Sequence, residues 1–103
     1  MTYRHQVMRN LVPGTLAEFV ALQQEKNALL VAAGLQPYAI WGPAFGGLHH
    51  LVLEAEFPTM AAFEAQHEAT KALAAIPAIN ARQLELTILG TASDGLQRLG
   101  LGV

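Results

Sequence analysis

Residues 38–59, YAIWGPAFGGLHHLVLEAEFPT, decide the fold. The stretch opens with a short strand pattern that ends at Trp41, passes through a glycine-rich turn, and resumes as a strand from His49 to Phe57. Alternate residues of this second run are almost all apolar, which predicts that one of its faces is buried. Pro58 ends the strand, and the hydroxyl of Thr59 is suited to cap a following helix. The stretch therefore predicts a hairpin that leads into a helix.

The composition indicates one small and unusually apolar domain. The 103 residues are 52% hydrophobic and 14% charged, whereas average globular domains are about 25% charged. One core of this size cannot cover so much apolar surface, which favours a homodimer with an apolar interface. The net charge of −2 and the scattered basic residues argue against nucleic-acid binding. The absence of cysteine excludes disulfides and thiolate metal sites.

Targeting signals are not evident in the sequence. The residues after Met1 do not have the pattern of a signal peptide. No apolar stretch approaches the roughly 18 residues that cross a bilayer. The expectation is a cytoplasmic protein with no membrane partner.

The remaining periodicities supply the rest of a ferredoxin-like α+β domain. Strand patterns cover residues 2–8, 37–41, 49–57 and 83–89, and helical patterns cover residues 14–33 and 60–75. This βαββαβ order predicts a four-stranded antiparallel sheet with both helices on one face. Residues 1–90 then form the domain. Residues 91–103 form a tail with a short helix, capped by Ser93 and reaching Leu101, that could dock on a partner subunit.

The other face of the sheet is expected to carry Val52, Met8 and Leu89 beside charged residues. Arg4 and Glu54 fall on this face, on strands that neighbour each other in the predicted sheet. Glu54, Glu56 and Glu85 are therefore read as members of an interface ion-pair network rather than as paired catalytic carboxylates.

Several segments resemble known families of this fold. Pro13-Gly14 before Leu16-Ala17-Glu18-Phe19, Ala33-Gly34-Leu35 leading to Trp41, and Phe57-Pro58-Thr59-Met60-Ala61-Ala62-Phe63-Glu64 are similar to NIPSNAP-like proteins. The helix Phe63-Glu64-Ala65-Gln66-His67-Glu68-Ala69-Thr70, with a histidine midway, resembles antibiotic-biosynthesis-monooxygenase-like proteins. The resemblance covers about residues 3–89 and places the chain with the dimeric α+β barrel superfamily.

The resemblance implies a homodimer that binds a small molecule. One implied function is that of a cofactor-independent monooxygenase, in which a bound aromatic or polyketide-like phenol loses a proton and its anion reacts with oxygen. The alternative is a NIPSNAP-like dimer that binds a ligand or has a structural role without catalysis. Haem-degrading relatives hold iron through a helix histidine, but their neighbouring motif residues are not recognisable here, so no cofactor is expected.

His67 is the candidate catalytic base. It falls on the helical stripe that faces the sheet, between Phe63 and Thr70. In one interpretation it is a core histidine that hydrogen-bonds to a backbone or hydroxyl partner. In the other it lies in a pocket between helix and sheet, where it acts as a base or ligand.

Five further residues are candidate substrate contacts. His5 and His49 belong by alternation to the helix-facing side of neighbouring strands, so both could approach His67. Three converging imidazoles could in principle bind a metal ion, but the spacing matches no metal signature and no metal is expected. The candidate substrate contacts are His5, Tyr38, Trp41, His49 and Phe63, with packing alone as the alternative for Trp41.

Overall fold

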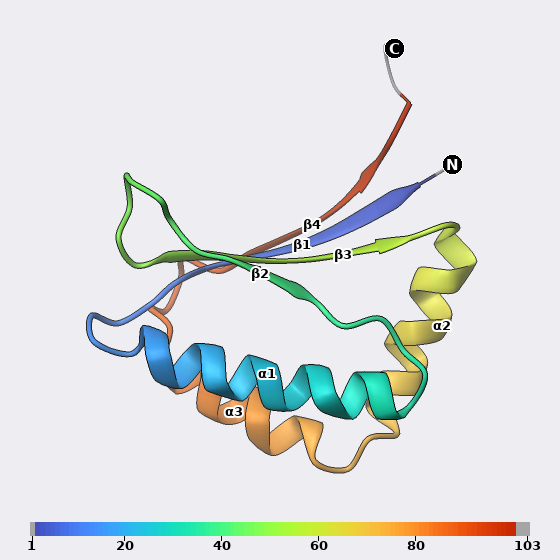
Figure 1. The fold of residues 1–103 in the computed structure, drawn as a ribbon, viewed down its shortest axis with the longest axis horizontal. Coiled ribbons are helices and arrows are strands. Elements are labelled where there is room, and N and C mark those ends of the chain that lie inside the picture. The colour runs from blue at the N-terminus through green and yellow to red at the C-terminus, as the bar shows by residue number, and fades with distance from the viewer. Residues whose placement is uncertain (1, 101–103) are drawn as a thin grey trace.

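The computed structural model describes residues 2–100, which form a four-stranded antiparallel sheet and three helices (Figure 1). The strand order is β2-β3-β1-β4, which is the order of a ferredoxin-like sheet, and confirms the α+β prediction. In chain order the elements are β1 (Tyr3–Asn10), α1 (Leu16–Ala32), β2 (Ala39–Trp41), β3 (His50–Phe57), α2 (Met60–Lys71), α3 (Ile76–Glu85) and β4 (Ser93–Arg98).

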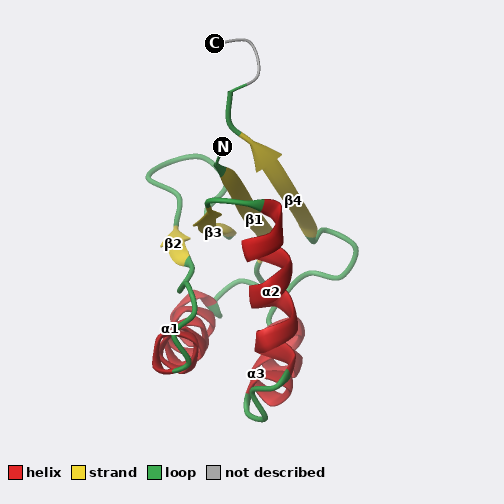
Figure 2. Ribbon diagram, turned by 90° about the vertical axis from the view of Figure 1, so that its right-hand side faces the viewer, coloured by secondary structure: helices red, strands yellow, loops and turns green. Residues whose placement is uncertain are grey.

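The molecule has a sheet layer and a helix layer. The central strand β1 pairs with β3 from Tyr3↔Phe57 to Asn10↔His50, and on its other side with β4 from Tyr3↔Arg98 to Met8↔Ser93. Helices α1 and α3 run side by side along one face of the sheet, while α2 stands at one end between the two layers (Figures 1 and 2). No helix of residues 2–100 covers the other face of the sheet.

The apolar alternation of β3 places its inner side chains in the core, as predicted. Leu51, Leu53, Ala55 and Phe57 are at most 5% exposed. Leu51 and Leu53 pack in one cluster with residues from the end of β1, from α1 and from the end of α3: Leu11, Phe19 and Leu86.

The predicted helix signals are also present. The backbone N–H of Ala62 donates to Oγ1 of Thr59 at 3.0 Å, so Thr59 caps α2. Gly34 follows α1 with φ of 74°, a left-handed conformation that suits glycine.

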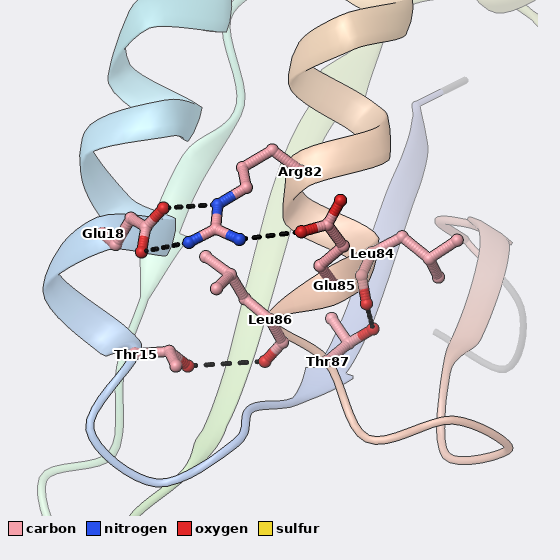
Figure 3. Close-up of polar contacts among 7 residues, drawn as sticks. All are labelled: Thr15, Glu18, Arg82, Leu84, Glu85, Leu86 and Thr87. Carbon is pink, nitrogen blue, oxygen red and sulfur yellow. Dashed lines mark hydrogen bonds and ion pairs between the residues drawn. The ribbon is translucent and has the colours of Figure 1, made fainter.

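Polar contacts hold α1 against α3 at the molecular surface (Figure 3). The guanidinium of Arg82 donates through Nε and Nη2 to the two carboxylate oxygens of Glu18, at 2.6 and 2.9 Å, and through Nη1 to Glu85 at 2.7 Å. The hydrogen bonds from Arg82 lower the pKa of Glu18 below its usual range. These side chains are exposed, so the contacts orient the helices more than they stabilise them.

The strand predicted at residues 83–89 is wrong. The alternation of Leu84, Leu86 and Ile88 resembles a strand, but residues up to Glu85 belong to α3. Its buried side chains, Ile76, Ile79 and Gln83, follow the helical spacing and continue to Leu86 beyond the helix end. Pro77 lies in the first turn of α3, where its missing N–H is no loss.

The fourth strand is Ser93–Arg98, in the segment predicted as a helical tail. Ser93 therefore caps no helix, and residues 93–98 are part of the sheet rather than outside the domain. An edge strand needs little apolar sequence because one face and one edge meet solvent. Leu96 is the one apolar side chain in this strand. Docking of the tail on a partner stays a prediction, and Leu101 lies outside the described residues.

The other differences are in length. The helix predicted at residues 60–75 ends at Lys71, and the strand predicted at 37–41 comprises Ala39–Trp41. On the open face Nε of Arg4 lies 3.6 Å from a carboxylate oxygen of Glu54, in agreement with the predicted ion pair. The placement of Glu85 in the same network is wrong, because Glu85 lies in α3 and pairs with Arg82. Within residues 2–100, no helix is both long enough and apolar enough to span a bilayer.

Truncation of Leu51 to alanine should destabilise the protein by about 2–5 kcal/mol, because this side chain is fully buried in the core and leaves a cavity. Chemical denaturation followed by circular dichroism measures the change. Leu48, which is 71% exposed in the adjacent turn, is the matched control. Leu48→Ala should lower the free energy of unfolding by less than about 0.5 kcal/mol. Equal losses for the two variants would contradict the assignment of this core.

Candidate functional site

A cavity of about 650 Å³ lies between the sheet and the helix layer. It is lined by residues of β1, β3 and β4 and of all three helices described above. In Figure 2, α2 stands in front of the space between the sheet above and α1 and α3 below. The volume falls in the range of small-molecule sites, about 300–1,000 Å³.

Apolar side chains from the sheet and two helices form much of the lining. Phe57 and Phe63 meet edge to face, with ring centroids 5.5 Å apart. The apolar wall, as it is called below, consists of Phe19, Leu30, Leu53, Phe57 and Phe63.

His5 and Tyr38 meet in this cavity. Their side chains share a hydrogen bond of 2.6 Å between Nδ1 of His5 and the Tyr38 hydroxyl. The His5 ring also lies edge-on to Phe63, with centroids 5.2 Å apart. Asn27 of α1 positions Tyr38, because its amide donates to the Tyr38 carbonyl at 2.8 Å and accepts from the Tyr38 N–H at 3.0 Å.

Burial favours the uncharged forms of both His5 and Tyr38. It lowers the pKa of His5 below 6.5, and the nearby His67 and Arg9 act in the same direction while Asp94 opposes them. Burial, with a smaller contribution from Asp94, raises the pKa of Tyr38 to about 12. A neutral imidazole at neutral pH is able to accept a proton.

The second ring nitrogen of His5 is accessible. Nε2 makes no hydrogen bond to residues 2–100, and no buried side-chain nitrogen or oxygen there lacks a partner. A molecule in the cavity can therefore reach the imidazole without displacing Tyr38.

His67 lines the cavity at its rim. Its ring stacks on Phe63, with centroids 6.2 Å apart and planes 23° apart, but the residue is exposed and has no hydrogen bond to the described chain. The interpretation as a buried core histidine is therefore wrong. His67 lines the cavity, and its role as a base or ligand stays a prediction.

The buried residue of α2 is Gln66, beside His67. Its amide accepts from the backbone N–H of Gln36 and donates to the Gln36 carbonyl, both at 2.8 Å. These bonds tie α2 to the segment that precedes β2 and Tyr38.

Two predicted contacts lie elsewhere. Trp41 is 61% exposed and pairs with Val52 on the opposite face of the sheet. His49 is exposed in the turn before β3. Neither lines the cavity. The expected approach of His49 to His67 is therefore wrong, and Trp41 neither contacts the cavity nor packs in the core. In the described part of the chain, no three histidine, aspartate or glutamate side chains gather in a group that could hold a metal ion.

A group of charged side chains in the cavity was not predicted. Lys26 of α1 points over α3, where its Nζ donates to Oδ1 of Asn80 at 2.6 Å and to Oε1 of Gln83 at 2.9 Å. Gln83 in turn donates to Gln23 at 3.1 Å. Burial lowers the pKa of Lys26 to about 8, and the positive charge of Arg9 contributes.

Arg9 and Asp94 belong to the same group of charged side chains in the cavity. Nη1 of Arg9 lies 2.6 Å from Oδ1 of Asp94 and joins β1 to β4. The strand alternation that selected His5 would also have selected Arg9 had the predicted strand, residues 2–8, been one residue longer. Asp94 gave no signal, because the strand that carries it was not recognised.

The fold is shared with solved structures. An uncharacterised NIPSNAP domain protein from Burkholderia xenovorans aligns over 100% of this chain and 98% of its own, with a TM-score of 0.76 and 14% identity. The chain has the fold of the NIPSNAP proteins. A NIPSNAP family protein from Agrobacterium tumefaciens aligns over 99% of this chain and 89% of its own, with a TM-score of 0.77 and 10% identity.

Proteins from the monooxygenase branch share the fold as well. A Nitrosomonas europaea protein, provisionally assigned as an antibiotic biosynthesis monooxygenase, aligns over 98% of this chain and 91% of its own, with a TM-score of 0.73 and 13% identity. No protein-family model matches the sequence, and no curated protein matches it.

The stability of the protein should rise with pH relative to a Lys26→Met variant. Burial lowers the Lys26 pKa from 10.5 to about 8 in the folded protein. Between pH 8 and pH 10.5 the unfolded chain binds more protons than the folded protein, so the free energy of unfolding rises with pH. Below pH 8 the folded protein bears the full cost of burying the charged ammonium group, and deprotonation removes this cost. Because the side chain is partly exposed, we expect a relative gain of about 1–2 kcal/mol between pH 7 and pH 10.

Urea denaturation at several pH values measures this trend. Lys71→Met is the matched control, since Lys71 is an exposed lysine that pairs with Glu68 at the surface. If the free energy of unfolding changed with pH in the same way for the wild-type protein and for Lys26→Met, the burial of the ammonium group would be contradicted.

Proposed function

We propose that the cavity binds an aromatic or polyketide-like small molecule and that the protein oxidises it without a cofactor. The observation that carries the proposal is the hydrogen-bonded His5–Tyr38 pair in a cavity of about 650 Å³ with an apolar wall. The likeness of fold to proteins of the monooxygenase branch supports it.

In the proposed reaction an imidazole removes a proton from a bound phenol or its activated methylene group. The resulting carbanion or phenolate is electron-rich enough to reduce oxygen directly. Conversion of the methylene to a carbonyl takes one atom of O₂ into the substrate and releases the other as water, so the electrons balance. The protein supplies the base, the orientation and the exclusion of water.

Two imidazoles are candidates for the base. His5 is the deeper one, and its hydrogen bond to Tyr38 holds the ring while Nε2 remains accessible. His67 lies at the rim and stacks on Phe63, where it would meet the substrate as it enters or act as the second base. Tyr38 and Phe63 are proposed as substrate contacts.

The alternative is a dimer that binds a ligand without transforming it, as the likeness to NIPSNAP proteins allows. The exposure of His67 and Lys71 favours this alternative, because water has access to the rim of the cavity and an anionic intermediate would be protonated there.

An oxygen electrode and a panel of polycyclic phenols and anthrones test the two functions. We expect His5→Ala to lower kcat about a hundredfold, as the loss of a general base does. His67→Ala should raise KM more than it lowers kcat. His49→Ala, which removes an exposed imidazole outside the cavity, should leave turnover unchanged. Binding without oxygen uptake for every compound would favour the non-catalytic alternative.

We also propose that the open face of the sheet forms a homodimer. Trp41, Val52 and Met8 stand in one register row across β2, β3 and β1. This apolar row lies on the face without helices, and Phe45 beside it is 92% exposed. Surfaces of this kind are common where subunits meet.

Sedimentation equilibrium should give twice the chain mass of 11.0 kDa. A Val52→Glu substitution should shift the protein to monomer, because it places a charge in the apolar row. Val31→Glu, at a 59% exposed position on α1, should leave the dimer intact. A wild-type monomer at all concentrations would refute the proposed dimer.

A further inference from the structure

The charge in the cavity is opposite to that of the whole protein. The net charge of the chain is −2, from six basic and eight acidic residues. Within residues 2–100, three of the six basic side chains line the cavity, namely Arg9, Lys26 and Lys71. One of the eight acidic side chains, Asp94, lines it. A concave site with an excess of one charge attracts ligands of the other.

Lys26 has no counter-ion in the described part of the chain. The ion pairs found there involve other residues, and the Lys26 ammonium donates to two neutral amide oxygens. One of its three N–H groups is left for another acceptor. A partly buried charge that is solvated by amides alone is costly, and a bound anion would offset this cost.

Arg9 adds donors beside Lys26. Its three hydrogen bonds, to two backbone carbonyls and to Asp94, all use Nη1. Nε and Nη2 have no partner within residues 2–100, and they are accessible, because no buried side-chain nitrogen there is unsatisfied. Asp94 neutralises part of the Arg9 charge, so Lys26 is the principal anion-binding group.

We propose that the ligand of this cavity is an organic carboxylate, with its anionic group bound by Lys26 beside Arg9 and its aromatic body against the apolar wall. This inference rests on the proposed binding of a small molecule in the cavity, and it adds the chemical class of that molecule. Charge-assisted hydrogen bonds from an ammonium and a guanidinium are the strongest that a protein makes to a carboxylate. A carboxylate held at Lys26 would place the rest of the ligand in the cavity that His5 and Tyr38 also line.

Two probes of the same shape test the inference, namely 2-naphthoate and its uncharged counterpart 2-naphthamide. Isothermal titration calorimetry at pH 7 should show that the wild-type protein binds 2-naphthoate at least about tenfold more tightly than 2-naphthamide. Lys26→Met should weaken the binding of 2-naphthoate about tenfold and change the affinity for 2-naphthamide by less than about twofold. Lys26→Arg, which retains the charge, should recover part of the loss.

Arg98→Met is the control, because it removes an exposed basic side chain that does not line the cavity. We expect it to change the affinity for 2-naphthoate by less than about twofold. Circular dichroism of each variant establishes that it is folded before binding is compared.

The outcomes separate this inference from the proposed function. If 2-naphthamide binds as well as 2-naphthoate, or if Lys26→Met weakens both equally, the cavity binds small molecules but not through an anion, and this inference fails alone. If neither probe binds, both this inference and the proposed binding function fail. Selective loss of 2-naphthoate in Lys26→Met supports both.

Discussion

Amide side chains tie the helices to one another and to the segment that leads into β2. Gln66 of α2 hydrogen-bonds to the backbone of Gln36, Asn27 of α1 to that of Tyr38, and Gln83 of α3 donates to Gln23 of α1. Gln23, Gln66 and Gln83 are all at least nine-tenths buried, and each has a partner, so their burial carries no penalty for unmade hydrogen bonds. All three line the cavity, so these contacts fix part of its wall.

The same amides lie beside two unlike groups in the cavity. Asn27 fixes the backbone of Tyr38, whose hydroxyl hydrogen-bonds to His5, and burial favours the uncharged forms of both side chains. Near Lys26, amide oxygens accept from the ammonium but supply no negative charge to balance it. The first group favours proton exchange, and the second favours an anion.

Much of the fold could be predicted from the sequence because apolar periodicity reports which side of an element is buried. It worked for β3, where alternate apolar residues face the core, and for α2, where Thr59 supplies the cap. It failed at residues 83–89, where the alternating leucines follow the same pattern as a strand although Gln83 and Leu86 are buried at the end of a helix. It also failed at β4, an edge strand that buries too little to need apolar residues.

The candidate site was harder to predict, for a related reason. His5, Tyr38, Phe63 and His67 could be placed because alternation and helical spacing locate inward positions. Lys26 could not, since charged residues on a helix normally face water. Its burial depends on α3, a helix that the sequence periodicity did not predict. Trp41 and His49 were misplaced because their positions depend on the hairpin turn, whose path periodicity does not determine.

The pairing of β1 with β4 makes the first and last strands of the sheet neighbours. Tyr3 lies opposite Arg98, almost the full length of the described chain away. Contacts this distant in sequence form slowly and cannot form on a nascent chain until residues 93–98 have left the ribosome. Until then β1 has a bare edge, Arg9 lacks Asp94, and the cavity is missing one wall. On a nascent chain the cavity is therefore completed only after β4 emerges, when every residue of the buried cluster has already been synthesised.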